Sequence, residues 1–165
     1  MTNRHASGEP QQIARWRRAS ELPPDVFAAW RKPERALNPV AIVATVNPDG
    51  TPRTAPFGSL RAVTPQLLRM ISMRYHDTYA NLRRDGRVTV ALLAPPNIAA
   101  TVRGRARVVR ERMNADEHSA VVEIDVEEVK NDMARSIVVE TGITISARDK
   151  FRDWFEAGLG ELDEM

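Results

Sequence analysis

Residues 40–57, VAIVATVNPDGTPRTAPF, decide the fold of this chain. The run of β-branched and small apolar residues at 40–46 predicts a strand. Asn-Pro-Asp-Gly at 47–50 then predicts a tight turn, because proline presets φ and glycine accepts a positive φ. Residues 51–60 are expected to return as a second, antiparallel strand. This stretch therefore predicts a β-hairpin.

Two prolines make the second strand of this hairpin unusual. Pro52 and Pro56 have no backbone N–H, so neither residue can donate to a strand ladder. We expect the strand to present these positions to a sheet edge or to a ligand.

Alternating hydrophobicity and turn residues predict the remaining elements. Strands are expected at 67–73, 87–94, 99–110 and 120–129, and helices at 25–32, 78–85 and 146–158. Asp77 is expected to cap the middle helix, and the last helix is expected to have an apolar side made by Phe151, Trp154 and Phe155. Six short, mostly antiparallel strands with few helices favour a closed or nearly closed barrel.

The length of 165 residues corresponds to one domain. We assign residues 1–22 to a flexible N-terminal arm and residues 23–165 to a single domain that ends in a helix. The composition, 42% apolar and 28% charged, excludes a disordered chain. No apolar run approaches the roughly 20 residues of a membrane span, no secretory signal is visible and cysteine is absent. We therefore expect a cytoplasmic protein that makes no contact with a membrane.

Charge is distributed unevenly along the chain. Residues 1–112 contain nineteen Lys or Arg and eight acids, whereas residues 113–165 contain five and fourteen. Either the first part meets an anionic partner, or the two parts neutralise each other within the fold. The second interpretation is favoured, because pairing of two adjacent strands would place two charged rows on one face: Arg103, Arg105 and Arg107 on one strand, and Glu123, Asp125 and Glu127 on the other.

The chain has no metal or nucleophile pattern. Its three histidines, His5, His76 and His118, lack the spacing of a zinc site, and we interpret His76 as an ordinary loop residue. No nucleophile elbow, phosphate loop or dinucleotide fingerprint occurs. Nucleic acid is not expected as a partner, because only 5% of the residues are aromatic and none is interleaved with the arginines of 103–112.

Side chains that can bind a phosphate gather around the second strand, the third strand and the helix that follows. They are Arg53, Thr54, Ser72, Arg74, Thr78 and Asn81. The start of that helix adds free N–H groups and the positive end of the helix dipole. This pattern makes a phosphate-bearing ligand one hypothesis, beside that of ordinary loop and surface residues.

Three stretches together carry a resemblance to a known family. They are residues 40–57, residues 67–92 (LLRMISMRYHDTYANLRRDGRVTVAL) and residues 101–109 (TVRGRARVV). Their order and spacing resemble the pyridoxamine 5′-phosphate oxidase-like, FMN-binding split-barrel family. The features that carry the resemblance are the Pro-Asp-Gly turn, a second strand with Arg-x-x-Pro, and a helix with Asn-Leu-Arg-Arg-Asp before the fourth strand.

The resemblance implies a mainly β protein, a six-stranded antiparallel Greek-key split barrel with a few short helices. It further implies a homodimer that binds the cofactor FMN at the subunit interface. By position, the cofactor contacts would be Arg53, Thr54, Ala55 and Pro56 on the second strand, Ser72, Met73, Arg74 and Thr78 on and after the third, and Asn81 in the helix.

The chain departs from that family pattern at three places. Thr78 replaces a basic residue common in relatives, Ala99 replaces a glutamine, and residues 149–165 lack an Arg-Leu-His-type motif for a substrate phosphate. The resemblance therefore implies an FMN-dependent oxidoreductase for an unknown small molecule, not a true pyridoxamine phosphate oxidase, with no catalytic residue identified. An F420-dependent reductase of the same fold and a non-catalytic flavin- or haem-binding module remain as alternatives.

Overall fold

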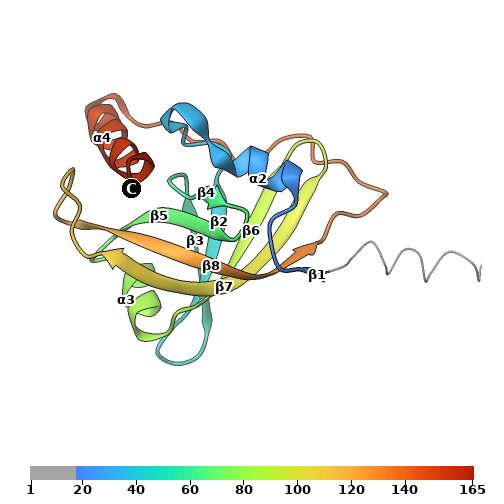
Figure 1. The fold of residues 1–165 in the computed structure, drawn as a ribbon, viewed down its shortest axis with the longest axis horizontal. Coiled ribbons are helices and arrows are strands. Elements are labelled where there is room, and N and C mark those ends of the chain that lie inside the picture. Colours follow the sequence, from blue (N-terminus) through green and yellow to red (C-terminus); the bar gives the residue numbers. More distant parts are fainter. Residues whose placement is uncertain (1–17) are drawn as a thin grey trace, which may run out of the picture.

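Antiparallel β-structure dominates the computed structural model, which describes residues 18–165 (Figure 1). The strands are β1 (Arg18–Ala19), β2 (Ala41–Val46), β3 (Pro52–Phe57), β4 (Arg61–Thr64), β5 (Leu67–Met73), β6 (Arg87–Ala94), β7 (Ile98–Arg110) and β8 (Ser119–Asn131). The helices are α2 (Pro24–Arg31), α3 (Asp77–Arg84) and α4 (Arg152–Asp163), with short 3₁₀ helices η1 (Pro33–Arg35) and η2 (Asp149–Phe151). No helix among these residues is long and apolar enough to cross a lipid bilayer.

The strands form one sheet in the order β3-β2-β6-β7-β8-β5-β4, and β1 pairs with β8 beside this path. All pairs are antiparallel, and β3 and β4 stand at the two ends of the order. The predicted fold class is thereby confirmed as a mainly antiparallel β fold, with an open sheet compatible with a split barrel. The sheet has eight strands and not six, because the predicted strand at 51–60 ends at Phe57 and a separate β4 follows, and β1 is only two residues long.

The hairpin of β2 and β3 has the predicted geometry. Gly50 has a φ of 85°, and its amide donates to the Asn47 carbonyl at 2.9 Å. Thr45 pairs with Arg53 across the hairpin, and Pro52 pairs with Val46. Since β3 ends the strand order, the prolines lie on an edge strand, as predicted.

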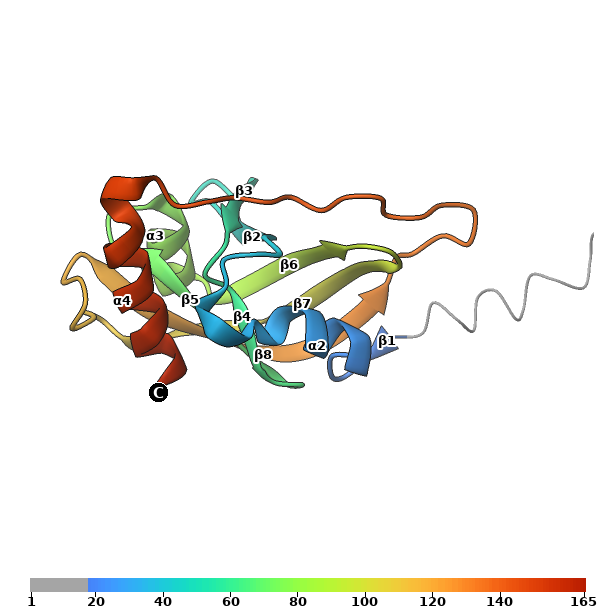
Figure 2. The ribbon, with the colours of Figure 1, turned by 90° about the horizontal axis from the view of Figure 1, so that it is seen from above.

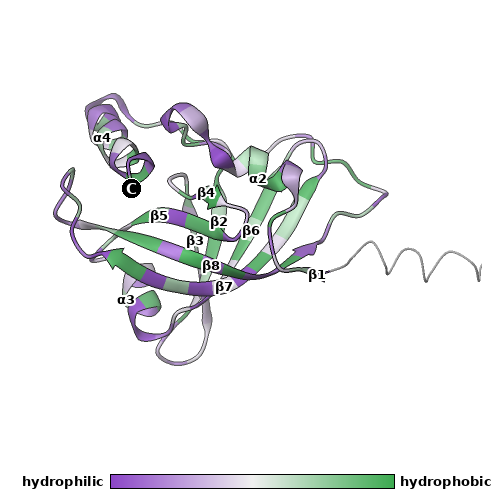
Figure 3. Ribbon diagram, in the orientation of Figure 1, coloured by the Kyte–Doolittle hydropathy of each residue, from purple (hydrophilic) through white to green (hydrophobic). Residues whose placement is uncertain are grey.

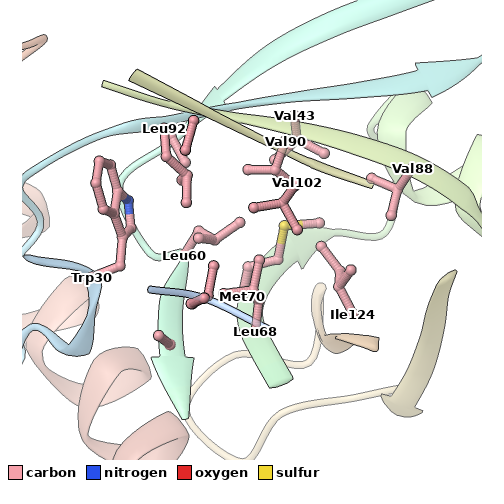
Figure 4. Packing of buried hydrophobic residues seen from close by; sticks show 14 of the residues in the cluster. Trp30, Val43, Leu60, Leu68, Met70, Val88, Val90, Leu92, Val102 and Ile124 are labelled. Carbon is pink, nitrogen blue, oxygen red and sulfur yellow. The ribbon is translucent and has the colours of Figure 1, made fainter. Parts of the chain in front are cut away.

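The hydrophobic core lies inside the curved sheet. Figure 4 shows side chains from several strands meeting there, with Trp30 of α2 beside them. Strand β7 alternates between buried and more exposed positions, whereas the first six residues of β8 are all buried and its second half is more exposed. Hydrophobic and hydrophilic residues occur along both strands (Figure 3). Trp30 is fully buried and Val26 is 4% exposed, so α2 closes one side of the core.

Two chain ends differ from the sequence predictions. Arg18 and Ala19 pair with β8, and Leu22 is only 2% exposed, so the folded domain begins before residue 23. The rest of the predicted arm, residues 1–17, lies outside the described residues. The last helix starts at Arg152, later than predicted, and buries Leu159 and Leu162, whereas Phe151 is exposed.

The position of α4 is explained by buried arginines of the sheet. Arg61 on β4 pairs with Asp163 at 2.8 Å, and Arg69 on β5 donates to the Leu162 carbonyl at 2.9 Å. Arg69 also pairs with Glu123 of β8 at 2.7 Å, and both side chains are nearly buried. These long-range bonds fix the position of the C-terminal end of α4. A local hydrophobic pattern in the sequence does not reveal such bonds.

The predicted charged rows of β7 and β8 do pair. Arg107 contacts Glu123 and Asp125, each at 2.6 Å. A bulge between Arg103 and Gly104 shifts the register further along. The first and second parts of the chain thus neutralise each other within the fold, which was the favoured interpretation of the charge asymmetry.

Lys32 is a buried cation at the end of α2. Its side chain is 3% exposed, and its Nζ donates to the carbonyls of Gly58 at 2.9 Å and Leu37 at 3.3 Å. Burial, and then the nearby Arg61 guanidinium, lowers the pKa of Lys32 from 10.5 to about 7.

The lowered pKa of Lys32 predicts a rise in stability with pH. Between about pH 7 and 10.5 the unfolded chain binds this proton and the folded chain does not, so the free energy of unfolding increases with pH. One such group contributes at most about 1.4 kcal/mol per pH unit. Urea unfolding at pH 6.5 and pH 9 should show that Lys32→Met loses this increase. Lys150→Met, at an exposed lysine, should keep it, and the same pH dependence in both variants would contradict the assignment.

Candidate functional site

A pocket of about 310 Å³ opens between β3, β5, the start of α3 and the C-terminal segment. Its volume lies at the lower end of the roughly 300–1,000 Å³ of small-molecule sites. The pocket is lined by Ala55, Pro56, Phe57, Gly58, Ser59, Ile71, Met73, His76, Ile145, Trp154 and Phe155. No lining residue is Asp, Glu, Lys or Arg, so the pocket suits an uncharged, largely apolar group.

Two of the polar side chains at this pocket have partners within the protein. The Ser59 hydroxyl accepts from the Ile71 amide at 3.1 Å and donates to the Ile71 carbonyl at 3.3 Å. The Trp154 indole lies near the Asp116 carboxylate and contributes to lowering the pKa of that group. His76 also lines the pocket.

His76, and not Asp77, caps α3. Its Nδ1 accepts from the Thr78 amide at 3.3 Å and lies 3.2 Å from the Thr78 hydroxyl. Since Nδ1 accepts this amide bond, the neutral ring carries its proton on Nε2. His76 lies in the loop before α3, as interpreted from the sequence, and from there it caps the helix. The sequence signal for this cap was its place directly before a helix, where a side chain can accept from the first turn.

A basic corner adjoins the His76 end of the pocket. Arg53 of β3 contacts the carboxylate of Asp77, the residue after His76, at 2.9 Å. The Arg53 side chain is 44% exposed and the Asp77 side chain 62% exposed, so this pair holds little energy and can be broken by a ligand. The corner thus offers a guanidinium close to the start of α3, where the helix dipole also favours an anion.

Two buried polar atoms of the segment 72–74 have no hydrogen-bond partner within residues 18–165. They are the hydroxyl of Ser72 and the Nε of Arg74. The rest of Arg74 is held by the β7–β8 connection, since its amide donates to the His118 carbonyl at 2.8 Å. Unpaired buried polar groups are costly, and they concentrate where a ligand or an ordered water completes them.

The structure brings most of the predicted site residues together. Ala55, Pro56 and Met73 line the pocket, and Arg53 and Thr78 contact the residues at its His76 end. Thr54 is exposed on β3, Ser72 is buried on β5, and Arg74 follows β5. The buried Asn81 instead tethers α3 to the hairpin: its amide nitrogen donates to Thr45 and Asn47, each at 3.0 Å.

The C-terminal wall of the pocket was not predicted. Ile145, Trp154 and Phe155 lie far in sequence from β3 and β5 but contact the same cavity. Figure 2 shows the extended segment before α4 running along the molecule toward α4, and Ile145 of this segment contacts Gly58, just past the end of β3. The apolar pattern of Trp154 and Phe155 was visible in the sequence, but it predicted a helix face on the core and gave no sign of a pocket.

Comparison with known families adds one clear match. A profile of the family described as pyridoxamine 5′-phosphate oxidase matches residues 31–141, which is more than half of the chain. No curated protein matches the sequence.

Solved structures share this fold at low sequence identity. A Lactobacillus delbrueckii protein provisionally named pyridoxamine 5′-phosphate oxidase is 22% identical over 67% of this chain and 94% of its own, with a TM-score of 0.55. HupZ of group A Streptococcus is 19% identical over 74% and 94%, with a TM-score of 0.52. An F420 reductase is 16% identical over 66% and 98%, also with a TM-score of 0.52. At such identities these similarities establish the fold.

The capping role of His76 can be measured directly. His76→Ala removes the acceptor of the Thr78 amide, so the free energy of unfolding should fall by about 1 kcal/mol. His76→Asn can accept the same bond and should retain most of the stability. Urea unfolding of the three proteins gives the comparison, and equal stability of wild type and His76→Ala would show that the cap contributes nothing.

Proposed function

This chain belongs to the pyridoxamine 5′-phosphate oxidase family, and from that premise we propose that it is an FMN-binding oxidoreductase acting on a small molecule. The observation that carries the proposal is the junction of two unlike surfaces. An uncharged pocket with an aromatic wall meets a basic corner at His76. FMN likewise combines a flat, uncharged ring system with a phosphate.

The residues present fit this cofactor. Arg53 can exchange Asp77 for phosphate oxygens, and charge-assisted bonds of this kind are worth about 1.5–3 kcal/mol each. The unpaired Ser72 hydroxyl and Arg74 Nε lie in the segment proposed to contact the phosphate side. In this role Arg74 compensates for Thr78, which stands where relatives have a basic residue.

Strand β3 is proposed to hold the ring. It ends the strand order, so the backbone on its outer edge has no neighbouring strand among the described residues. Ala55 and Pro56 bring that backbone to the pocket, where the apolar lining excludes water. FMN, when bound, supplies the hydride or electron transfer, and this chain binds and orients it and shields it from water.

The proposed substrate is not pyridoxamine phosphate. The C-terminal segment reaches the pocket with Ile145, Trp154 and Phe155 and brings no charged side chain into its lining. A substrate phosphate would therefore find no cation on this side of the pocket. We infer a small substrate without a strong negative charge at this position.

F420 is the second candidate cofactor. One structure with the same fold is an F420 reductase, and a deazaflavin has a comparable planar ring system. The pocket and the basic corner suit both cofactors, so direct binding must decide between them. A protein that binds either one without turnover of any substrate would be the non-catalytic module.

A homodimer is proposed with the cofactor at the subunit interface. Large apolar side chains are exposed along the segment before α4 and on the adjacent β6: Leu93 is 47% exposed, Ile137 58%, Val138 56% and Ile143 50%. This segment lies against the sheet, because the Val139 amide donates to the Pro96 carbonyl at 2.9 Å. Apolar groups gathered on one surface favour cover by a second copy.

Titration with FMN and riboflavin tests the proposed cofactor site. The wild-type protein should bind FMN at micromolar concentration or tighter, which corresponds to at least about 8 kcal/mol. Arg53→Ala should weaken FMN binding by roughly ten- to a hundredfold and leave riboflavin, which lacks the phosphate, almost unchanged. Asp77→Asn should strengthen FMN binding, because it removes the competing carboxylate. Quenching of flavin fluorescence measures all of these affinities.

Arg103→Ala is the matched control, since Arg103 is an exposed arginine of β7 paired with Glu128 and does not line the pocket. If Arg53→Ala loses the same factor of affinity for FMN and for riboflavin, Arg53 stabilises the sheet and does not bind the phosphate. Tight binding of F420 without binding of FMN would identify F420 as the cofactor in place of FMN. A protein that binds neither cofactor would refute the proposed function.

Light scattering tests the dimer. The wild-type protein should have twice the 18.5 kDa mass of the chain. Leu93→Glu places a charge in the proposed interface and should yield monomers, whereas Val63→Glu, on β4 at the other end of the strand order, should not. A monomeric wild-type protein with bound FMN would contradict the proposed assembly.

A further inference from the structure

Two aromatic side chains of α4 form one side of the pocket. The rings of Trp154 and Phe155 have centroids 4.7 Å apart and an interplanar angle of 81°, an edge-to-face pair. The Trp154 indole lies near the Asp116 carboxylate, which accepts from the Ser119 hydroxyl at 2.7 Å. Each ring therefore has a close neighbour in the fold.

The helix that carries these rings is firmly attached to the sheet. Leu159 and Leu162 are each 1% exposed, and the salt bridge of Arg61 to Asp163 holds the end of α4. The Glu161 carboxylate accepts from the amides of Asn114 and Ala115 at 2.9 and 2.8 Å. The aromatic pair thus belongs to a wall of fixed position.

Ile145 extends the wall, and hydrogen bonds to the Asn38 side chain hold its backbone in place. The Asn38 side chain donates to the Ile145 carbonyl at 2.9 Å and accepts from the Ile145 amide at 2.8 Å. Ile145 also lies so close to Gly58 that a Cβ at Gly58 would be 2.5 Å from its Cδ1. A side chain at residue 58 would therefore force the end of the Ile145 side chain to move.

This wall lies outside the part of the chain that matches the family. The match ends at residue 141, so β3 and β5 come from the shared region and Ile145, Trp154 and Phe155 come from beyond it. The matched region supplies one side of the pocket, and residues beyond the match supply the other.

We propose that Trp154, Phe155 and Ile145 form a ring-binding wall, against which a flat, uncharged, fused aromatic ring system lies with β3 on its other side. This inference rests on the proposed function, in which that ring is the isoalloxazine of FMN. The wall acts on the ring and the basic corner acts on the phosphate, so the two contribute separately to affinity. Aromatic contact of this kind changes affinity by about two- to tenfold.

The test compares two ligands on variants of the same helix. Trp154→Leu should weaken FMN and riboflavin by the same factor of about two to ten, and Trp154→Phe should restore most of the binding. Phe151→Ala, which removes an exposed aromatic residue that does not line the pocket, should bind both ligands like the wild type. Quenching of the Trp154 emission by riboflavin, assigned by its loss in Trp154→Phe, reports direct contact with the ring.

Each outcome distinguishes the wall from the cofactor proposal. If the wild type binds FMN and Trp154→Leu binds both flavins as tightly as the wild type does, the proposed ring-binding wall is refuted, while the proposed cofactor site is retained. If the loss in Trp154→Leu is confined to FMN, Trp154 acts on the phosphate end and the inference is likewise refuted. If wild type binds neither flavin, the proposed function itself fails. Circular dichroism and thermal unfolding confirm that each variant is folded.

Discussion

The buried pair of Arg69 and Glu123 is the interaction on which the rest of this structure depends. It joins β5 to β8 with an Nη2–Oε1 distance of 2.7 Å, while a second nitrogen of Arg69 donates to the Leu162 carbonyl of α4. Removal of one partner from such a buried pair costs about 3–5 kcal/mol, because it leaves the other charge unpaired. One guanidinium therefore couples the sheet to the C-terminal helix.

The pocket exists because of this coupling. Its floor belongs to β3 and β5 and its aromatic wall belongs to α4, so neither part makes a site alone. The basic corner depends on a separate contact, the cap that His76 gives to α3 and that places Asp77 beside Arg53. A rigid apolar cavity and a breakable surface ion pair thus meet at one residue. This division is suited to a ligand with an apolar ring at one end and an anion at the other.

Charge in this protein serves two different purposes. Most arginines of the first part of the chain are used internally, as in the row of β7 that pairs with the acids of β8. The arginine side chains of these pairs are about half exposed to solvent, which limits the contribution of the pairs to stability. Arg53 differs because its partner Asp77 lies at a helix start beside the pocket. The position of an arginine, and not the overall basic composition, makes it a candidate for ligand binding.

The sequence by itself determined the antiparallel β fold, the hairpin of residues 40–57 and the segments that meet at the basic corner. These follow from local chemistry, namely alternating hydrophobicity, the Asn-Pro-Asp-Gly turn and the prolines of an edge strand. Only the tertiary structure decided the helix cap at His76, the face that α4 buries and the wall made by Ile145, Trp154 and Phe155. These depend on contacts between distant segments, and a local pattern shows which residues are apolar but not which surface will cover them.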